Sequence, residues 1–189
     1  MAKKKSKKDT KKNKDIKIVN IVVSTSLEHD IPLEKMAATL SNTEYNPEQF
    51  PGLVIRIKEP KTSALIFSSG KVVCTGARTM KEVDESLKKI IKSLEKISIK
   101  IKVKPELNIQ NIVASGNIGM MLNLNTLAMK LENTEYEPEQ FPGLVYKLRE
   151  AKATFLLFSN GKIVCTGTKS EGEVYQAVDM LVSNLKKLK

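Results

Sequence analysis

The sequence predicts an α+β fold of two similar halves, each with an antiparallel sheet that helices cover on one side. Three observations support this: an internal repeat, apolar β-rich runs joined by tight-turn residues, and two long amphipathic segments one repeat apart. With 189 residues, 41% of them hydrophobic, the chain can bury a substantial core.

The repeat is read directly from two loops that differ at one position. Residues 42–54 are NTEYNPEQFPGLV and residues 133–145 are NTEYEPEQFPGLV, and about two-thirds of Asn42–Gly76 is identical to Asn133–Gly167. An offset of 91 residues is too long for a solenoid repeat. We therefore expect two half-domains, 16–106 and 107–189, related by a pseudo-twofold axis.

Each half alternates strand and helix signals in the same order. Strands are predicted at 16–24 and 107–115, and short helices follow around residues 33–40 and 124–131. The next strands are LVIRIK, SALIF and KVVCTG in the first half and LVYKLR, TFLLF and KIVCTG in the second. The joints SSG and SNG predict hairpins.

A longer helix closes each half. Thr79 with Glu82, and Ser170 with Glu173, form capping-box patterns at the repeat offset. Apolar residues on one helical face then follow, namely Val83, Leu87, Ile90, Ile91 and Leu94, and Val174, Val178, Leu181, Leu185 and Leu188. These helices are expected to cover one side of the sheet.

Charge and rare residue types restrict the function. Residues 1–17 hold nine Lys and two Asp, or +7 of the net +11, so residues 1–15 are expected to be a disordered arm, with DNA affinity or a nuclear address as alternatives. No signal peptide or membrane span is apparent, so an intracellular location is expected. The two cysteines, Cys74 and Cys165, occupy matching strands, and His29 is the only histidine. We expect no metal, no cofactor and no enzymatic activity.

The sheet side opposite the helices is predicted to bind an anionic partner. Several strands are apolar on both faces, which leaves apolar surface that the helices cannot cover. The eight predicted strands contain no Asp or Glu, whereas Arg56, Lys58, Lys71, Lys147, Arg149 and Lys162 lie in them or at their ends. An apolar surface with cations around it suits a sugar-phosphate backbone approached from the minor groove.

Polar residues in the strands add a hydrogen-bonding prediction. Asn20 and Asn111 are equivalent strand residues on the same faces as Val22 and Val113, and Thr75 and Thr166 form a second equivalent pair. Amide and hydroxyl groups among aliphatic side chains can pair with the A N3 and T O2 acceptors of the minor groove. The alternative is that these asparagines satisfy local backbone groups.

Four of the five phenylalanines form repeat-equivalent pairs, Phe50 with Phe141 and Phe67 with Phe158. Core packing is the ordinary role of an aromatic ring. These four lie near loop and strand ends, however, and Phe50 and Phe141 each precede Pro-Gly. We therefore predict that they enter between base pairs as wedges.

The sequence resembles the TATA-box-binding-protein family over residues 16–188. The resemblance rests on QNIVAS, both EQFPGLV loops, EPKTSALIFSSGKVVCTG with its second copy, and EVYQA in the last helix. It implies a saddle, in which one curved antiparallel sheet of about ten strands has four helices on its convex face and DNA beneath its concave face. Bending of DNA by wedging is likewise implied by the family.

The resemblance also assigns roles to residues. Phe50 with Phe67, and Phe141 with Phe158, are the implied intercalating pairs, braced by Pro51 and Pro142. The implied central hydrogen-bonding residues are Asn20, Asn111, Thr75 and Thr166. The implied groove-floor residues are Val22, Val113, Leu65, Leu156, Val73 and Val164, and the implied phosphate contacts are Arg56, Lys58, Lys147 and Arg149.

Partners are implied as well. The second loop matches the family's docking point for transcription factor B, here Glu137, Glu139 and Gln140, and recruitment of RNA polymerase follows in the preinitiation complex. The short arm and the alike halves favour an archaeal-type protein, cytoplasmic and associated with the nucleoid, or nuclear if eukaryotic. Weak homodimerisation through the apolar face without DNA stays open.

Two alternatives compete with promoter binding. The sheet can serve as a stacking platform for single-stranded nucleic acid, although that class places aromatic residues in mid-sheet. The apolar face can also pair with another protein chain as an interaction scaffold.

Overall fold

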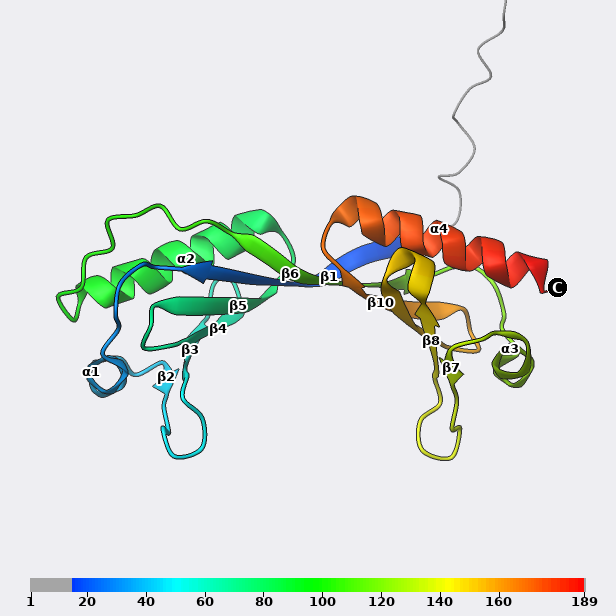
Figure 1. The fold of residues 1–189 in the computed structure, drawn as a ribbon, viewed down its shortest axis with the longest axis horizontal. Coiled ribbons are helices and arrows are strands. Elements are labelled where there is room, and N and C mark those ends of the chain that lie inside the picture. The colour runs from blue at the N-terminus through cyan, green and yellow to red at the C-terminus, as the bar shows by residue number, and fades with distance from the viewer. Residues whose placement is uncertain (1–14, 189) are drawn as a thin grey trace, which may run out of the picture. The chain divides into compact units, whose positions relative to one another are not determined.

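The strands form one ten-stranded antiparallel sheet in the order β2-β3-β4-β5-β1-β6-β10-β9-β8-β7 (Figure 1). The structure is a computed structural model that describes residues 15–188. The strands are β1 (Asp15–Ser26), β2 (Thr43–Glu44), β3 (Leu53–Ile57), β4 (Thr62–Ile66), β5 (Lys71–Ala77), β6 (Asn108–Asn117), β7 (Thr134–Glu135), β8 (Leu144–Leu148), β9 (Ala153–Leu157) and β10 (Lys162–Thr168). The helices are α1 (Leu33–Thr39), α2 (Met80–Glu95), α3 (Leu124–Lys130) and α4 (Glu171–Lys187), with a 3-10 turn η1 (Arg149–Ala151).

The chain divides into two compact units that do not coincide with the sequence repeats. The 18–113 unit comprises Ile18–Val113 with residues 169–171, and the 114–188 unit comprises residues 15–17, Ala114–Thr168 and 172–188. Strands β1 and β6 therefore each contribute residues to both units. The arm predicted at 1–15 lies outside the described residues except for Asp15, which begins β1.

In the 18–113 unit, α2 packs against β3 and β5, and α1 lies beside β2. Thr79 caps α2, since its side chain accepts a hydrogen bond from the Glu82 backbone N–H at 3.2 Å. The Glu82 carboxylate accepts from the Arg78 backbone N–H, one residue before the position expected for a capping box. The helix is thereby fixed with Leu87, Ile90 and Leu94 buried in the core.

The 114–188 unit repeats this plan with different side chains. Helix α4 begins directly after Ser170 and buries Val174, Val178 and Leu181, as its periodicity predicts. The facing strands bury Leu144, Phe155 and other apolar residues. Phe155, which replaces Ala64 of the first repeat, is among the largest fully buried side chains.

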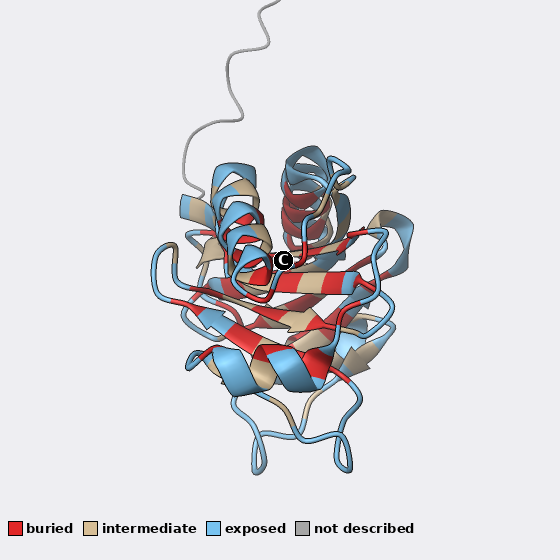
Figure 2. Cartoon of the chain, turned by 90° about the vertical axis from the view of Figure 1, so that its left-hand side faces the viewer, coloured by how far each residue is buried: buried red, intermediate tan, exposed pale blue. Residues whose placement is uncertain are grey.

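Burial alternates along every long strand, which identifies the two faces. Leu53, Ile55 and Ile57 of β3 are buried, whereas Val54 is half-exposed and Arg56 is exposed. Because successive strand side chains point to opposite faces, the buried set packs under the helices and the other set faces away from them. In Figure 2, buried and more exposed residues alternate along the strands.

The structure adds two strands that the residue patterns alone did not indicate. β2 and β7 each consist of Thr-Glu, and they pair with β3 and β8 respectively. Two residues are too few to show a period of two. The eight predicted strands contain no acidic residue, but the observed strands do, because Glu44 and Glu135 belong to these short strands and Asp15 begins β1.

Candidate nucleic-acid interface

In the 18–113 unit, the predicted contact residues form rows across neighbouring strands on the face opposite α2, here called the open face of the unit. Val54, Leu65 and Val73 lie directly opposite one another on β3, β4 and β5. The next row contains Arg56, Ser63 and Thr75. Apolar and polar predicted residues are thus brought together in adjacent rows.

The 114–188 unit has the equivalent open face. Val145, Leu156 and Val164 form its apolar row, and Lys147, Thr154 and Thr166 form its polar row. All except Lys147 are half-exposed, and Lys147 is exposed.

The strand asparagines lie on the same side as these rows. Asn20 and Val22 of β1, and Asn111 and Val113 of β6, are half-exposed. Asn20 Oδ1 accepts a hydrogen bond from the Gly76 backbone N–H at 2.7 Å, where Gly76 has a φ of +94° beside an irregularity in the β1-β5 register. Its Nδ2 donates to Thr75 Oγ1 at 3.2 Å. The local role considered from the sequence is therefore real for Asn20, and the donor side of its amide is positioned by Thr75.

Each phenylalanine predicted to act as a wedge contacts the second phenylalanine of its repeat. The ring centroids of Phe50 and Phe67 are 6.0 Å apart at 63°, and those of Phe141 and Phe158 are 6.0 Å apart at 69°. This edge-to-face geometry is the favoured arrangement for aromatic pairs. Phe50 and Phe141 are each 43% exposed, so they are not core residues.

Pro-Gly after each wedge shapes the loop around the rings. Pro51 and Pro142 are exposed and fix the backbone next to the phenylalanine. A Cβ on Gly52 would lie 2.7 Å from the Phe50 ring and 3.1 Å from the Phe67 ring. Gly143 stands in the same relation to Phe141 and Phe158. A side chain at either position would therefore force the adjacent ring to shift.

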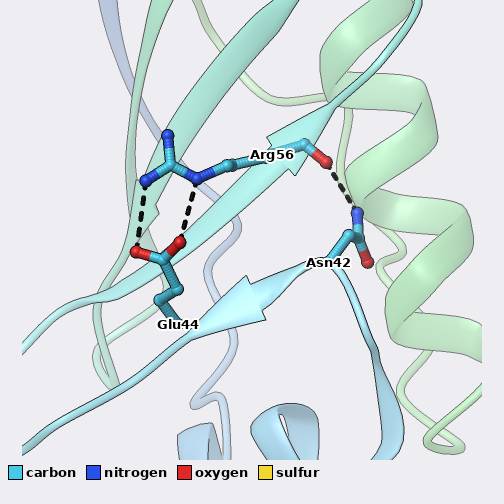
Figure 3. A network of polar contacts seen from close by, with 3 residues as sticks. All are labelled: Asn42, Glu44 and Arg56. Atoms are coloured by element: carbon cyan, nitrogen blue, oxygen red, sulfur yellow. Dashed lines mark hydrogen bonds and ion pairs between the residues drawn. The ribbon is translucent and has the colours of Figure 1, made fainter.

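The predicted phosphate-binding cation Arg56 is held by a carboxylate (Figure 3). Arg56 Nε and Nη2 donate to Glu44 Oε1 and Oε2, both at 3.1 Å. This hydrogen bond, and then the charge of Arg56, lower the pKa of Glu44, while Glu44 raises the pKa of Arg56. The second repeat has Lys147 Nζ donating to Glu135 Oε1 at 2.6 Å. Lys58 and Arg149 are exposed just beyond β3 and β8.

The residues assigned to transcription factor B lie in the exposed loop between β7 and β8. Glu137, Glu139 and Gln140 are all exposed. The Glu137 backbone carbonyl accepts from the N–H groups of Gln140 at 3.0 Å and Phe141 at 2.9 Å. Asn46 does the same for Gln49 and Phe50 in the first loop, so the two loops share one backbone turn.

The remaining sites are structural. Cys74 and Cys165 are buried, and burial raises the pKa of each thiol to about 11. Within residues 15–188 there is no group of His, Cys, Asp or Glu side chains that could hold a metal ion. In the same range, every helix is too short or too polar to cross a membrane.

Several residues of the open faces were missed by the sequence reasoning. They are Val54, Ser63 and Ser24 in the 18–113 unit and Val145, Thr154 and Ser115 in the 114–188 unit. Each lies two residues from a predicted contact on the same strand, so strict alternation would have found them. The predicted contacts concerned are Arg56, Leu65, Val22, Lys147, Leu156 and Val113. Glu44 and Glu135 gave no such signal.

Duplicated open faces that combine apolar rows, strand amides, exposed cations and half-exposed ring pairs define a class of protein that binds through the surface of a sheet. Comparison with known proteins identifies the family within that class. The family model of transcription factor TFIID (or TATA-binding protein, TBP) matches twice, at residues 15–97 and 106–188. The chain therefore belongs to this family, which is one of transcription factors and not of enzymes.

Individual relatives agree along almost the whole chain. The TATA-box-binding protein of Methanocaldococcus jannaschii is 49% identical over 92% of this chain and 95% of its own. That of Methanothermococcus thermolithotrophicus is 51% identical over 92% and 96%, respectively. A solved structure described as Methanococcus jannaschii TBP superimposes with a TM-score of 0.85 at 50% identity, covering 91% of this chain and 98% of that one.

Proposed function

We propose that this chain is a general transcription factor that binds the minor groove of promoter TATA-box DNA and bends the duplex by inserting its phenylalanine pairs. It then nucleates the preinitiation complex by recruiting transcription factor B and RNA polymerase. The action takes place on the chromosome, in the cytoplasm of an archaeal cell. The relatives reported above, all named TATA-box-binding proteins, support the DNA target.

The observation that carries the proposal is the pair of aromatic contacts. Each repeat holds one ring, Phe50 or Phe141, 43% exposed and stacked edge-to-face on a second ring next to the open face. A half-exposed ring braced by another ring and by Pro is rigid enough to enter a base-pair step. Unstacking costs a few kcal/mol per base-pair step. Contact between the apolar rows and the widened groove offsets this cost.

The open faces also suit the minor groove chemically. Their apolar rows leave little room for the guanine amino group, and the amide and hydroxyl groups face the A N3 and T O2 acceptors. The Nδ2 group of Asn20 carries two hydrogens, of which one is directed at Thr75 Oγ1. The second hydrogen is available to a base acceptor.

Minor-groove recognition is tested with three duplexes of equal length. These are a TATA site, the same site with every A·T replaced by inosine·cytosine, and a random sequence. Inosine·cytosine changes the major-groove edge but keeps the minor-groove pattern. We expect the first two duplexes to bind with similar affinity. The random duplex should bind at least roughly 10³-fold more weakly, as for specific DNA binders.

Two outcomes would contradict the proposal. Loss of affinity on inosine·cytosine substitution would indicate major-groove reading, and tighter binding of the corresponding single strands would indicate a stacking platform. Both measurements use the full chain at a stated salt concentration, since DNA affinity depends strongly on salt.

A further inference from the structure

We propose that Glu44 and Glu135 are built-in competitors of DNA phosphates: each holds the phosphate-directed cation of its own repeat and so lowers the sequence-independent part of the affinity for DNA. This inference rests on the proposed function. It concerns two residues that the repeat keeps unchanged, in Thr43–Glu44 and Thr134–Glu135.

The strand register places carboxylate and cation on the same face. Glu44 lies opposite Val54, and Arg56 is two residues further along β3, so Glu44 and Arg56 are diagonal neighbours. The backbone at this point is fixed, because Arg56 N donates to Asn42 O at 2.9 Å and Asn42 Nδ2 donates to Arg56 O at 2.8 Å (Figure 3). Formation of β2 therefore brings the Glu44 carboxylate and the Arg56 guanidinium into contact.

The 114–188 unit builds the same pair with a different cation. Glu135 lies opposite Val145, and Lys147 is two residues further along β8. Lys147 N donates to Asn133 O at 3.0 Å, as Arg56 N does to Asn42 O. The cation changes from Arg to Lys between the repeats, whereas the carboxylate does not.

Both pairs are open to a phosphate. The side chains of Arg56 and Glu44 are 61% and 66% exposed, and those of Lys147 and Glu135 are 55% and 67% exposed. Exposed ion pairs of this kind are worth at most about 1 kcal/mol, so a phosphate can displace the carboxylate. The carboxylate then remains within a few ångströms of the phosphate and repels it, well inside the Debye length of about 8 Å at physiological salt.

Each carboxylate occupies the hydrogen-bonding position on the cation that a DNA phosphate would use. A carboxylate offers two coplanar oxygens to the guanidinium fork of Arg56, as a phosphate does. While the fork is filled, Arg56 contributes little net charge to attract DNA. Since phosphate contacts position a duplex but carry no sequence information, weakening them acts on every duplex and leaves recognition to the apolar rows, amides and rings.

The test is the salt dependence of binding by Glu44→Gln, which keeps the size of the side chain but removes its charge. On a random duplex and on the TATA duplex, we expect tighter binding at low salt and a steeper plot of log K against log salt, by up to about 0.9 for one released phosphate-binding cation. The gain should fade as salt rises. Glu135→Gln should act in the same way through Lys147.

A matched control separates this effect from a change in net charge. Glu34 is an exposed carboxylate in the first turn of α1, so Glu34→Gln changes net charge equally without touching the open face. A double-mutant cycle adds a second control. In an Arg56→Gln background, Glu44→Gln should give a smaller gain in affinity and a smaller change in salt slope, because the cation is absent and only the repulsion between carboxylate and phosphate is relieved.

Three results would overturn the inference: an unchanged slope in Glu44→Gln, a change equal to that of Glu34→Gln, or the same gain in the Arg56→Gln background. Weaker binding by Glu44→Gln would instead show that the pair braces β2. Failure of the proposed function is seen separately, as the absence of TATA preference in the unaltered protein.

Discussion

At the scale of single residues, the two loops differ only by Asn46 in the first and Glu137 in the second. In both loops it is the backbone carbonyl at this position that accepts the two turn hydrogen bonds. The turn therefore does not depend on whether the side chain at this position is Asn or Glu. Glu139 and Gln140 cannot distinguish the two loops, because Glu48 and Gln49 match them.

We predict that Glu137→Asn weakens assembly with transcription factor B by about 2- to 10-fold, corresponding to about 0.5–1.5 kcal/mol for one polar contact. Affinity for DNA alone should be unchanged, since the loop keeps its backbone turn. The measurement is titration of factor B onto the preformed DNA complex. Asn46→Glu in the first loop is the matched control and should leave factor B binding unaltered; equal assembly by Glu137→Asn would refute the prediction.

At the scale of elements, sequence patterns worked wherever an element was long enough to show a period. The amphipathic faces of α2 and α4, the hairpins and the strands that carry Asn20 and Asn111 were all predictable. The two-residue strands β2 and β7 were not, because their existence depends on pairing with β3 and β8. The sequence alone therefore indicates loop positions for Glu44 and Glu135 and gives no sign of their ion pairs.

The loops between β2 and β3 and between β7 and β8 carry Phe50 and Phe141, the predicted wedges. We predict that Phe50→Ala or Phe141→Ala reduces DNA bending, measured by energy transfer between dyes at the duplex ends. Affinity should fall by roughly 10- to 100-fold, since burial of a Phe side chain contributes about 1.5–3 kcal/mol.

Met129→Ala provides the control for this experiment. Met129 is 80% exposed on α3, and its truncation removes apolar surface without changing a ring pair. Bending by this variant should equal that of the unaltered protein. If Phe50→Ala instead lowered the unfolding temperature strongly and left the bend intact, the ring would stabilise the loop and would not act on DNA.

At the scale of the whole molecule, the boundaries of the two sequence repeats differ from the boundaries of the two compact units. The family model matches end and restart between residues 97 and 106, whereas the compact units change over within β1 and within β6. The repeat was visible because its loops are nearly identical. The unit boundaries within β1 and β6 were not visible in the sequence, because they depend on long-range strand pairing that a single sequence does not encode locally.

The position of the unit boundary within β6 predicts which part of the fold is destabilised when Ile112 is truncated. The residue is 3% exposed and follows the start of the second repeat, yet it belongs to the 18–113 unit. Ile112→Ala leaves a core cavity and should cost roughly 2–5 kcal/mol. We therefore expect amide hydrogen exchange to speed up most in the 18–113 unit.

Ile163→Ala is the matched variant, because Ile163 is 2% exposed and lies in the 114–188 unit. It should speed exchange most in β8 and β9. If Ile112→Ala acted first on β8 and β9 instead, sequence repeats rather than compact units would be the cooperative elements of the fold. Since native-state exchange resolves local from global opening, the two variants separate these cases even when their total destabilisation is equal.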